Sequence, residues 1–550
     1  MHILEDPLNG YGLCSTLYVE CDTCELLQFF STGKHNVSDK VPRTMQGKDI
    51  NRRSVFAANE VGLGREGIAI CEALNMPPPV APTAWAARED KLYKQNLVIN
   101  EELEKNRCEL KELFQRGSSQ SHQCNLPVSV SFDGTWAKRG FTSNHGVGFV
   151  ILTDTCKVLD YSVVSKACSA CRINEKRLSQ EEFELWRRDH DCVGGYEGSS
   201  PSMETECARK IWNRSRDHGL EYRFMVSDGD SKAYNSVWDV YGVCSDCDKY
   251  ERMEKSSSDY IKWKNSLAYK QWEKDHLSEE AGCHRVVKLD CVGHVQKRMG
   301  KALRDVQQQK GKLPDGKPVG DRPGRLTKPA IEKLQKYYGR AIRNNAKNGE
   351  LTTEETERAI KAMQNEIKAG LYHSCKLPDK ERYKYCPSNS WCSYKRTGKP
   401  IENKGHHLDP VFVEHLEHVY VHLSDEKLLK RCLPGHTQNS NECINSLVWK
   451  RCPKHKCFGR KRVEMAAISA TLHFCSGAKA KHRVMELSGI KAGVQTMYAS
   501  QKRDIQRVKK AEKRSSELFK RKRRATKRVA VRIEEARIQG EGTTYEAGAF

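Results

Sequence analysis

The sequence of 550 residues lacks any apolar run long enough to cross a bilayer. Its first segment, residues 1–13, contains Glu and Asp where a secretory signal peptide needs an apolar core. Acidic residues are outnumbered, with 71 Asp and Glu against 94 Lys and Arg, so the formal net charge is +23. These absences argue against a membrane protein, and we expect a soluble, intracellular protein that binds a polyanion such as DNA.

The positive charge is most concentrated near the C-terminus. Residues 501–528 hold 14 Lys or Arg and three acids. The segment includes five consecutive basic residues, Lys520, Arg521, Lys522, Arg523 and Arg524. Such a run is typical of a nucleic-acid contact or a nuclear import signal, and a solvated charged surface is the alternative. We therefore expect residues 496–550 to form a basic tail of a nuclear protein.

We do not expect the 23 cysteines to form disulfides inside a cell, so closely spaced ones are candidate metal ligands and the others buried thiols. One set of four has the spacing of a structural zinc site: Cys168, Cys171, His190 and Cys192. Buried thiols or another pairing are the alternative. Cys21 and Cys24 form only half of a zinc ribbon and are weaker candidates. We expect residues 1–100 to form a partial zinc-ribbon-like and helical module.

Strand patterns dominate the next region. Apolar residues alternate from Val128 to Phe132, and residues 146–152 and 157–164 follow at hairpin spacing. Residues 222–226 and 285–289 supply two further strands, with a helix predicted at 204–218 between the third and fourth strands. The sequence thus predicts a mixed α/β core over residues 127–310, interrupted by a zinc knuckle at 168–192.

Acidic residues occur at the ends of these elements. Asp133 lies on the first strand, Asp228 and Asp230 follow the fourth, and Glu442 begins an amphipathic segment. Acids so placed can converge on a pair of divalent metals, which prefer hard oxygen ligands. Taken singly, Asp133 with Gly134 is also compatible with a hairpin turn, and Glu442 with a carboxylate facing the helix dipole.

Five segments resemble the Mutator-like transposase family: Phe-Asp-Gly-Thr-Trp (132–136), Tyr-Glu-Gly-Ser-Ser (196–200), Ser-Asp-Gly-Asp-Ser (227–231), Asp-Cys-Val-Gly-His-Val-Gln-Lys-Arg-Met-Gly (290–300) and Gln-Asn-Ser-Asn-Glu (438–442). The resemblance runs from about residue 14 to about residue 470. It implies a cut-and-paste DNA transposase with a ribonuclease-H-like core and an Asp-Asp-Glu triad.

The residues that match this triad are Asp133, Asp228 and Glu442, with Asp230 as the alternative to Asp228. They would hold two Mg²⁺ or Mn²⁺ ions for in-line phosphoryl transfer. In terms of the family, residues 311–435, which have helical periodicity, resemble a helical insertion before the final catalytic helix region at 436–495.

The resemblance also covers Cys291 and His294, which match a Cys-x-x-His signature of the wider transposase superfamily. Two ligands cannot complete a zinc site, so the expected partners come from the insertion: His373, Cys375, Cys386 or Cys392. A packed thiol and a hydrogen-bonded imidazole are the alternative. Arg298 and Lys301 are candidate phosphate contacts. Three tryptophans could stack on bases but are more often core residues: Trp136, Trp391 and Trp449.

These features favour a metal-dependent transposase that cleaves element ends at terminal inverted repeats and joins 3′-hydroxyls to target DNA, acting as a homo-oligomer. Two rivals are a non-catalytic DNA-binding protein derived from a transposase and a nuclease without strand transfer. The three acids count against the first rival, and only a strand-transfer assay separates the second.

Overall fold

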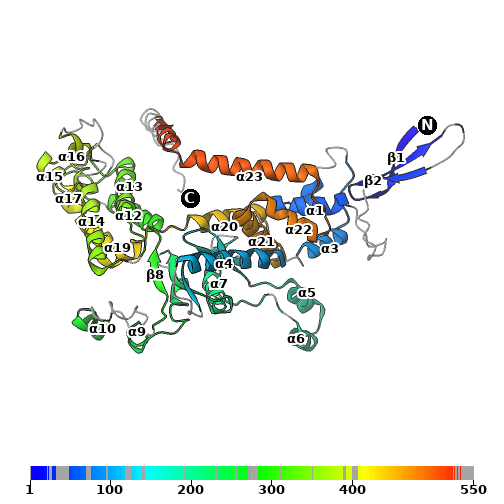
Figure 1. Cartoon of the computed structure of the whole chain (residues 1–550), viewed down its shortest axis with the longest axis horizontal. Coiled ribbons are helices and arrows are strands. Elements are labelled where there is room, and N and C mark those ends of the chain that lie inside the picture. Colours follow the sequence, from blue (N-terminus) through cyan, green and yellow to red (C-terminus); the bar gives the residue numbers. More distant parts are fainter. Residues whose placement is uncertain are drawn as a thin grey trace. The chain divides into compact units, whose positions relative to one another are not determined.

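The computed structural model describes residues 2–21, 23, 28–32, 49–69, 76–93, 97–117, 125–137, 143–190, 192, 194–228, 232–251, 253, 257–269, 272, 283–309, 311–320, 323–349, 351–387, 392–398, 407–523, 525–526, 529–530 and 533. The chain forms two compact units, residues 1–99 with 468–550, and residues 100–467. Figure 1 labels the elements. None of the described helices is both long and apolar enough to span a membrane.

The first unit begins with an antiparallel sheet that the sequence analysis did not predict. Its strands, in spatial order, are β1 (His2–Tyr11), β2 (Cys14–Glu20) and β3 (Gln28–Ser31). Cys21 directly follows β2, whereas Cys24 lies outside the described residues. The partial zinc-ribbon-like and helical module expected for residues 1–100 stays a prediction. Backbone pairing between strands organises this first segment, and such pairing leaves only a weak local pattern in a mixed polar sequence.

Helices complete the first unit. They are α1 (Asp49–Val61), η2 (Arg65–Ala69), α3 (Pro82–Tyr93), the end of α21 (Arg460–Ser476), η5 (Ala478–Ala480), α22 (Lys481–Leu487) and α23 (Val494–Ser515). Val55, Ala58, Val80 and Trp85 form a small buried core. Gly62 has a φ of +73° and lies between α1 and η2, as expected for a turn between helices.

The second unit contains a mixed sheet of five strands, as the sequence analysis predicted. The strands are β4 (Leu126–Trp136), β5 (His145–Leu152), β6 (Val158–Ser165), β7 (Leu220–Ser227) and β8 (Val287–Asp290), in the order β6-β5-β4-β7-β8. β4, β5 and β6 pair antiparallel, and β4, β7 and β8 pair parallel. Asp133 lies within β4, so the alternative of a hairpin turn at Asp133 and Gly134 is wrong.

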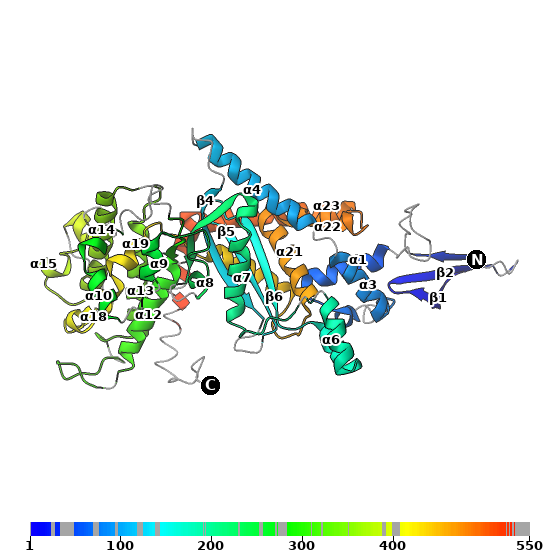
Figure 2. The ribbon, with the colours of Figure 1, turned by 90° about the horizontal axis from the view of Figure 1, so that it is seen from below.

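The two faces of β4 contact different helices, because successive side chains of a strand point to opposite faces. Phe132 packs edge-to-face on Trp212 of α7 (Ser202–Asn213), with ring centroids 5.6 Å apart. Asp133 and its neighbours at odd positions instead contact α20 (Asn439–Arg451). A Cβ on Gly134 would lie 2.4 Å from Glu204 of α7, so glycine permits this close approach. Figure 2 shows α7 across β4, β5 and β6.

Further helices lie at the edge of the sheet and in its connections. At the β6 edge, Asn106 and Arg107 of α4 (Leu97–Gly117) donate hydrogen bonds to the carbonyls of Val158 and Leu159. The connections contain α5 (Ser169–Arg177), α6 (Gln180–Asp189), η3 (Arg216–His218), α8 (Lys232–Asn235), α9 (Ser245–Glu251) and α10 (Ser258–Lys264).

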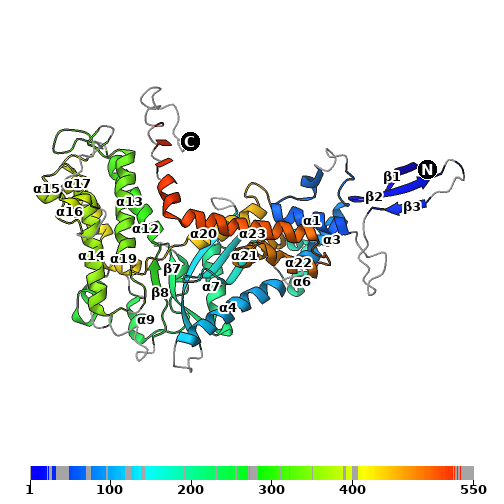
Figure 3. The same cartoon turned by 45° about the horizontal axis from the view of Figure 1, so that its top comes forward.

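A second core lies among helices after β8 (Figure 3). They are α12 (Val292–Gln307), α13 (Lys328–Asn344), α14 (Thr353–Tyr372), α15 (Asp379–Arg382), α16 (Ser393–Thr397), α17 (Phe412–His415), α18 (Glu417–Leu423) and α19 (Glu426–Cys432). The helical periodicity of residues 311–435 corresponds to buried apolar faces: Ile331, Leu334, Tyr338 and Ile342 on α13, and Ile360, Met363, Ile367 and Leu371 on α14.

Candidate active site

Parallel pairing brings Asp133 and Asp228 together. Ser131 of β4 is the register partner of Val226 of β7. Asp133 lies two residues further along β4, and Asp228 two residues beyond Val226, just after β7 ends. Because both strands run in the same direction, the two carboxylates lie side by side at one end of the sheet. Asp230, the alternative ligand, lies outside the described residues.

Glu442 comes from the first turn of α20, which polar side chains hold against the sheet. Ser131 Oγ donates to Asn441 Oδ1 at 2.6 Å, and Asn441 Nδ2 donates to the Phe149 carbonyl at 3.0 Å. Gln438 Nε2 donates to the Phe132 carbonyl at 2.7 Å. These bonds are buried, so they are shielded from water and give α20 a defined position along β4. Glu442 thereby joins the two aspartates.

The electrostatics of Asp133 show how crowded the acids are. The pKa of Asp133 is raised from 3.8 to about 6, chiefly by burial and also by the negative charges of Glu442 and Asp228. His294 and a 2.9 Å hydrogen bond from Asn445 Nδ2 oppose this rise in the pKa. A cation at this position would relieve the repulsion between the carboxylates.

Glu204 is a fourth acid at this site, and the sequence analysis did not identify it. Burial is the main cause that raises its pKa to about 8, and the charges of Asp133 and Asp228 add to the effect. A hydrogen bond from the backbone of Gly134 opposes it. Glu204 lies in the first turn of α7, within a helix whose amphipathic pattern gave no sign that one acid reaches the end of the sheet.

Basic side chains of α12 border the acids. Arg298 Nη2 lies 3.3 Å from Asp228 Oδ1, and Lys297 Nζ lies 3.5 Å from Glu442 Oε1. His294 Nε2 is 4.0 Å from the same Glu442 oxygen. The Glu442 and Asp228 side chains are more than half exposed, so each ion pair contributes little to stability. Their arrangement leaves cations available to a phosphate that approaches the acids. Lys301 is exposed on the same helix, and its role as a phosphate contact stays a prediction.

A cleft of about 470 Å³ opens beside the acids. It is lined by Asp133, Thr135, Glu442, Asn445, Ser446, Trp449, Lys450 and Lys454. Trp449 Nε1 donates to Thr135 Oγ1 at 2.8 Å, and Lys454 Nζ lies 5.3 Å from the Trp449 ring centroid. Trp449 thus lines the cleft, whereas Trp136 packs against the core of the sheet and Trp391 lies outside the described residues.

The donor set of this site suits a hard divalent cation. Asp133, Asp228 and Glu442 offer carboxylate oxygens, which Mg²⁺ and Mn²⁺ prefer. Asn445 Oδ1 is buried without a hydrogen-bond partner in the structure, which leaves one more oxygen beside Asp133. Burial, together with repulsion from Glu442 and Asp228, raises the pKa of Asp133, and this is the pattern expected where a cation belongs. These residues therefore fit the metals that the sequence analysis expected.

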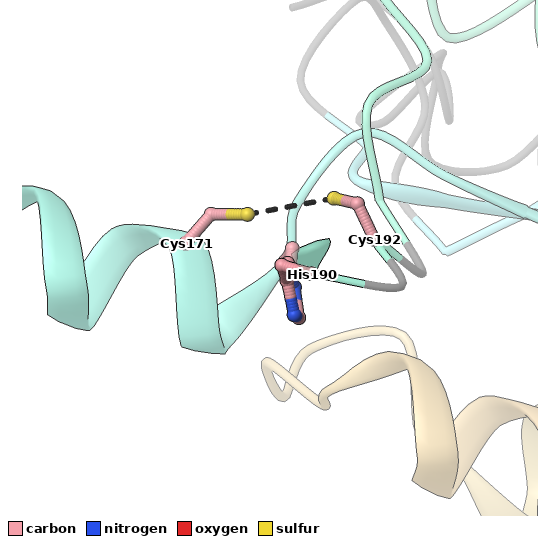
Figure 4. Close-up of side chains that lie close together, drawn as sticks. Cys171, His190 and Cys192 are labelled. Carbon is pink, nitrogen blue, oxygen red and sulfur yellow. Dashed lines mark hydrogen bonds between the residues drawn. The ribbon is translucent and has the colours of Figure 1, made fainter. Parts of the chain in front are cut away.

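The first predicted zinc group converges in the structure (Figure 4). The ligand atoms of Cys168, Cys171, His190 and Cys192 all lie within 4.8 Å of one another. Cys168 Sγ is 3.2 Å from His190 Nε2, and Cys171 Sγ is 3.4 Å from Cys192 Sγ. The His190 ring stacks on Trp186, with centroids 4.3 Å apart, which orients the imidazole. Four convergent N and S ligands could hold one tetrahedral zinc ion.

The second predicted zinc group is only partly assembled. His373, Cys386 and Cys392 gather within 4.8 Å, but no metal-compatible group among the described residues includes Cys291, His294 or Cys375. Cys291 and His294 instead hydrogen-bond to each other, and Cys291 Sγ accepts from the Gln438 N–H at 3.3 Å. The expected pairing was therefore wrong, because β8 ends beside the acids and carries the Cys-x-x-His motif to them.

The role of the basic tail as a nucleic-acid contact stays a prediction. Lys520, Arg521, Lys522 and Arg523 are exposed on a helical segment, and Arg524 lies outside the described residues.

Together, the sheet and its carboxylates define a mixed α/β protein with a candidate metal-binding cleft and separate cysteine-rich groups that could hold zinc. The family model described as Mutator-like transposase matches residues 4–258 and 265–392. This is more than half of the chain, which therefore belongs to the Mutator-like transposase family. The family implies a DNA-binding, DNA-modifying enzyme. The match ends before α20, so it does not cover Glu442. No curated protein and no solved structure matches the chain significantly.

Proposed function

We propose that this protein is a DDE-type transposase that cleaves DNA at element ends and joins the 3′-hydroxyls to target DNA by two-metal phosphoryl transfer. The observation that carries the proposal is the convergence of Asp133, Asp228 and Glu442 from two strands and one helix far apart in the sequence. Membership of a transposase family gives this convergence a chemical context.

The three carboxylates would hold two Mg²⁺ or Mn²⁺ ions, with Glu204 next to them. When bound, such ions supply an activated water or 3′-hydroxyl and stabilise the leaving oxygen of an in-line displacement. The contribution of the chain is to place the ligands rigidly. Asn445 orients Asp133 through the 2.9 Å hydrogen bond, and the buried bonds of Asn441 hold Glu442 at the sheet.

Phosphates of the DNA backbone would lie on the basic border of the acids. Lys297 and Arg298 flank them on α12, and Lys450 and Lys454 line the cleft on the side of α20. Such contacts position DNA without reading its sequence. Trp449 offers an aromatic face at the same cleft on which a base could stack.

The strand order supports a ribonuclease-H-like core for this chemistry. Asp133 lies on the central strand β4 and Asp228 directly follows the adjacent strand β7, which pairs parallel with β4. A rigid sheet is a suitable mount for ligands that must keep their positions during catalysis. We further propose a homo-oligomer acting in the nucleus on terminal inverted repeats and target DNA.

A nuclease without strand transfer would use the same acids, and a DNA-binding relative without catalysis would not need them. Incubation with a plasmid that carries the element's flanking ends, in Mg²⁺ or Mn²⁺, separates the three functions. The proposal expects integration products from the native protein and none from Asp133→Asn. The matched control is Asp217→Asn, because Asp217 is exposed beside Leu220, at the opposite end of the sheet. Cleavage without joining would favour the nuclease, and no cleavage by the native protein would favour the binding protein.

A further inference from the structure

Three cysteines outside the sites described above converge at the start of β8. Cys244 and Cys247 form a Cys-x-x-Cys pair at the beginning of α9, and Cys283 precedes β8. Their Sγ atoms all lie within 4.8 Å of one another, with Cys247 Sγ 3.5 Å from Cys283 Sγ. Thiolates bound to one tetrahedral zinc ion at about 2.3 Å lie about 3.8 Å apart. The spacing of the sulfur atoms is therefore that of ligands around a single ion.

Hydrogen-bond donors and one cation lie close to these sulfur atoms. The N–H of Cys247 donates to Cys244 Sγ at 3.4 Å, and the N–H groups of Cys244 and Arg285 donate to Cys283 Sγ. Arg285 Nη1 lies 3.9 Å from Cys247 Sγ. Three thiolates around Zn²⁺ carry one net negative charge, which the neighbouring guanidinium offsets. Donors and a cation directed at sulfur are the pattern expected around a metal-thiolate group.

Ordinary buried thiols are the alternative, since Cys247 and Cys283 both belong to the core of the sheet. A buried thiol that serves only as a small apolar side chain does not require donors. Cys207 illustrates this case in the same core, because its Sγ donates to the Ser162 carbonyl at 3.5 Å and it belongs to no metal-compatible group of the described residues. The three converging cysteines differ from it in both respects.

We propose that Cys244, Cys247 and Cys283 bind a structural zinc ion. Cys247 lies in α9 and Cys283 precedes β8, so the ion would join two segments that are 36 residues apart in the sequence. Two backbone bonds already join the same segments, from His284 N–H to the Gly242 carbonyl at 3.0 Å and from Val286 N–H to the Trp238 carbonyl at 2.8 Å.

The position of this ion matters for the candidate active site. β8 begins four residues after Cys283 and ends at Asp290, and α12, with His294, Lys297 and Arg298, follows at once. A cross-link at the start of β8 would thus restrain the strand that leads into the basic border of the acids. The described residues supply three ligands. The absorption spectrum of the cobalt-substituted protein would identify the type of the fourth ligand.

Zinc content of the purified full-length chain tests the proposal. Cys244→Ser should contain one zinc equivalent per chain less than the native protein, because Cys244 is half-buried and its replacement leaves the core intact. The matched control is Cys207→Ala, which removes a buried thiol of the same core and should leave the zinc content unchanged. An unchanged zinc content in folded Cys244→Ser would overturn the proposal.

A measurement on the native protein decides the matter if the variant does not fold. Cys244 should resist alkylation by N-ethylmaleimide and become labelled when a zinc chelator is added, as peptide mass spectrometry would show. Exposed Cys108 should be labelled in both conditions. Equal labelling of Cys244 with and without the chelator would overturn the proposal. Thiolate-to-cobalt charge-transfer absorption that decreases in Cys244→Ser would support the zinc site. The spectrum of the cobalt protein would also report whether the fourth ligand is nitrogen, oxygen or sulfur.

Discussion

Replacing Asp133 with Asn should stabilise the metal-free protein while it removes activity. The pKa of Asp133 is raised from 3.8 to about 6, chiefly by burial and then by the charges of Glu442 and Asp228. The folded state therefore holds this proton more tightly than the unfolded state. Stability falls as the pH rises from about 4 to about 6, and above that range the ionised carboxylate costs the folded state about 3 kcal/mol.

Asn has the same shape and no charge, so Asp133→Asn should recover most of this cost. We expect the free energy of unfolding to rise by about 2–3 kcal/mol at pH 8 and by less than about 1 kcal/mol at pH 4, where the native carboxyl is already protonated. Urea unfolding in EDTA at the two pH values measures both quantities. Asp133→Asn should also lose the stabilisation that Mg²⁺ or Mn²⁺ gives the native protein at pH 8.

The matched control changes a buried aspartate whose charge is compensated. Asp160 accepts hydrogen bonds from Arg214 Nε and Nη2, both at 2.7 Å, so Asp160→Asn should lower the free energy of unfolding by about 1–3 kcal/mol. The two substitutions thus have opposite signs. The reasoning fails if Asp133→Asn destabilises the metal-free protein at pH 8, or if its effect is the same at both pH values.

The remaining predictions concern the site, the zinc group and the tail. Asp228→Asn and Glu442→Gln should each abolish plasmid cleavage yet change the Kd for DNA by only a few fold in a filter-binding assay, because phosphate contacts lie on other residues; a large loss of binding would contradict this separation. Cys168→Ser and Cys192→Ser should each lower the zinc content and the melting temperature, and zinc-free folded native protein would count against the site. Deleting residues 501–550 should reduce the slope of log Kd against log salt by about 0.9 per lost phosphate contact and should impair nuclear import; an unchanged slope and localisation would indicate a solvated tail.

Short-range patterns in the sequence predicted much of the fold. Alternation of apolar residues located β4, because side chains of a strand point to alternate faces, and apolar runs at hairpin spacing located β5 and β6. Helical periodicity identified the buried faces of α13 and α14 for the same kind of reason. The N-terminal sheet escaped prediction, since its pairing depends on contacts between strands rather than on a strong local pattern.

For the candidate site, sequence spacing grouped Cys168, Cys171, His190 and Cys192 correctly, because these ligands are close along the chain. It paired the Cys291 motif with the wrong partners. It also did not group Cys283 with Cys244 and Cys247, although these two have Cys-x-x-Cys spacing. Which distant ligands meet depends on how the intervening segments fold.

By itself, the sequence determined the strands of the five-stranded sheet, the helical character of residues 311–435, the basic character of the chain and the acids able to bind metal, because these follow from residue identity and local periodicity. Only the tertiary structure decided that parallel pairing of β4 and β7 places Asp133 beside Asp228, that buried bonds of α20 add Glu442, and that Glu204 reaches the same point from α7. The physical reason is that strand register and helix packing are set by burial and hydrogen bonding between segments far apart in the chain, which no local pattern encodes.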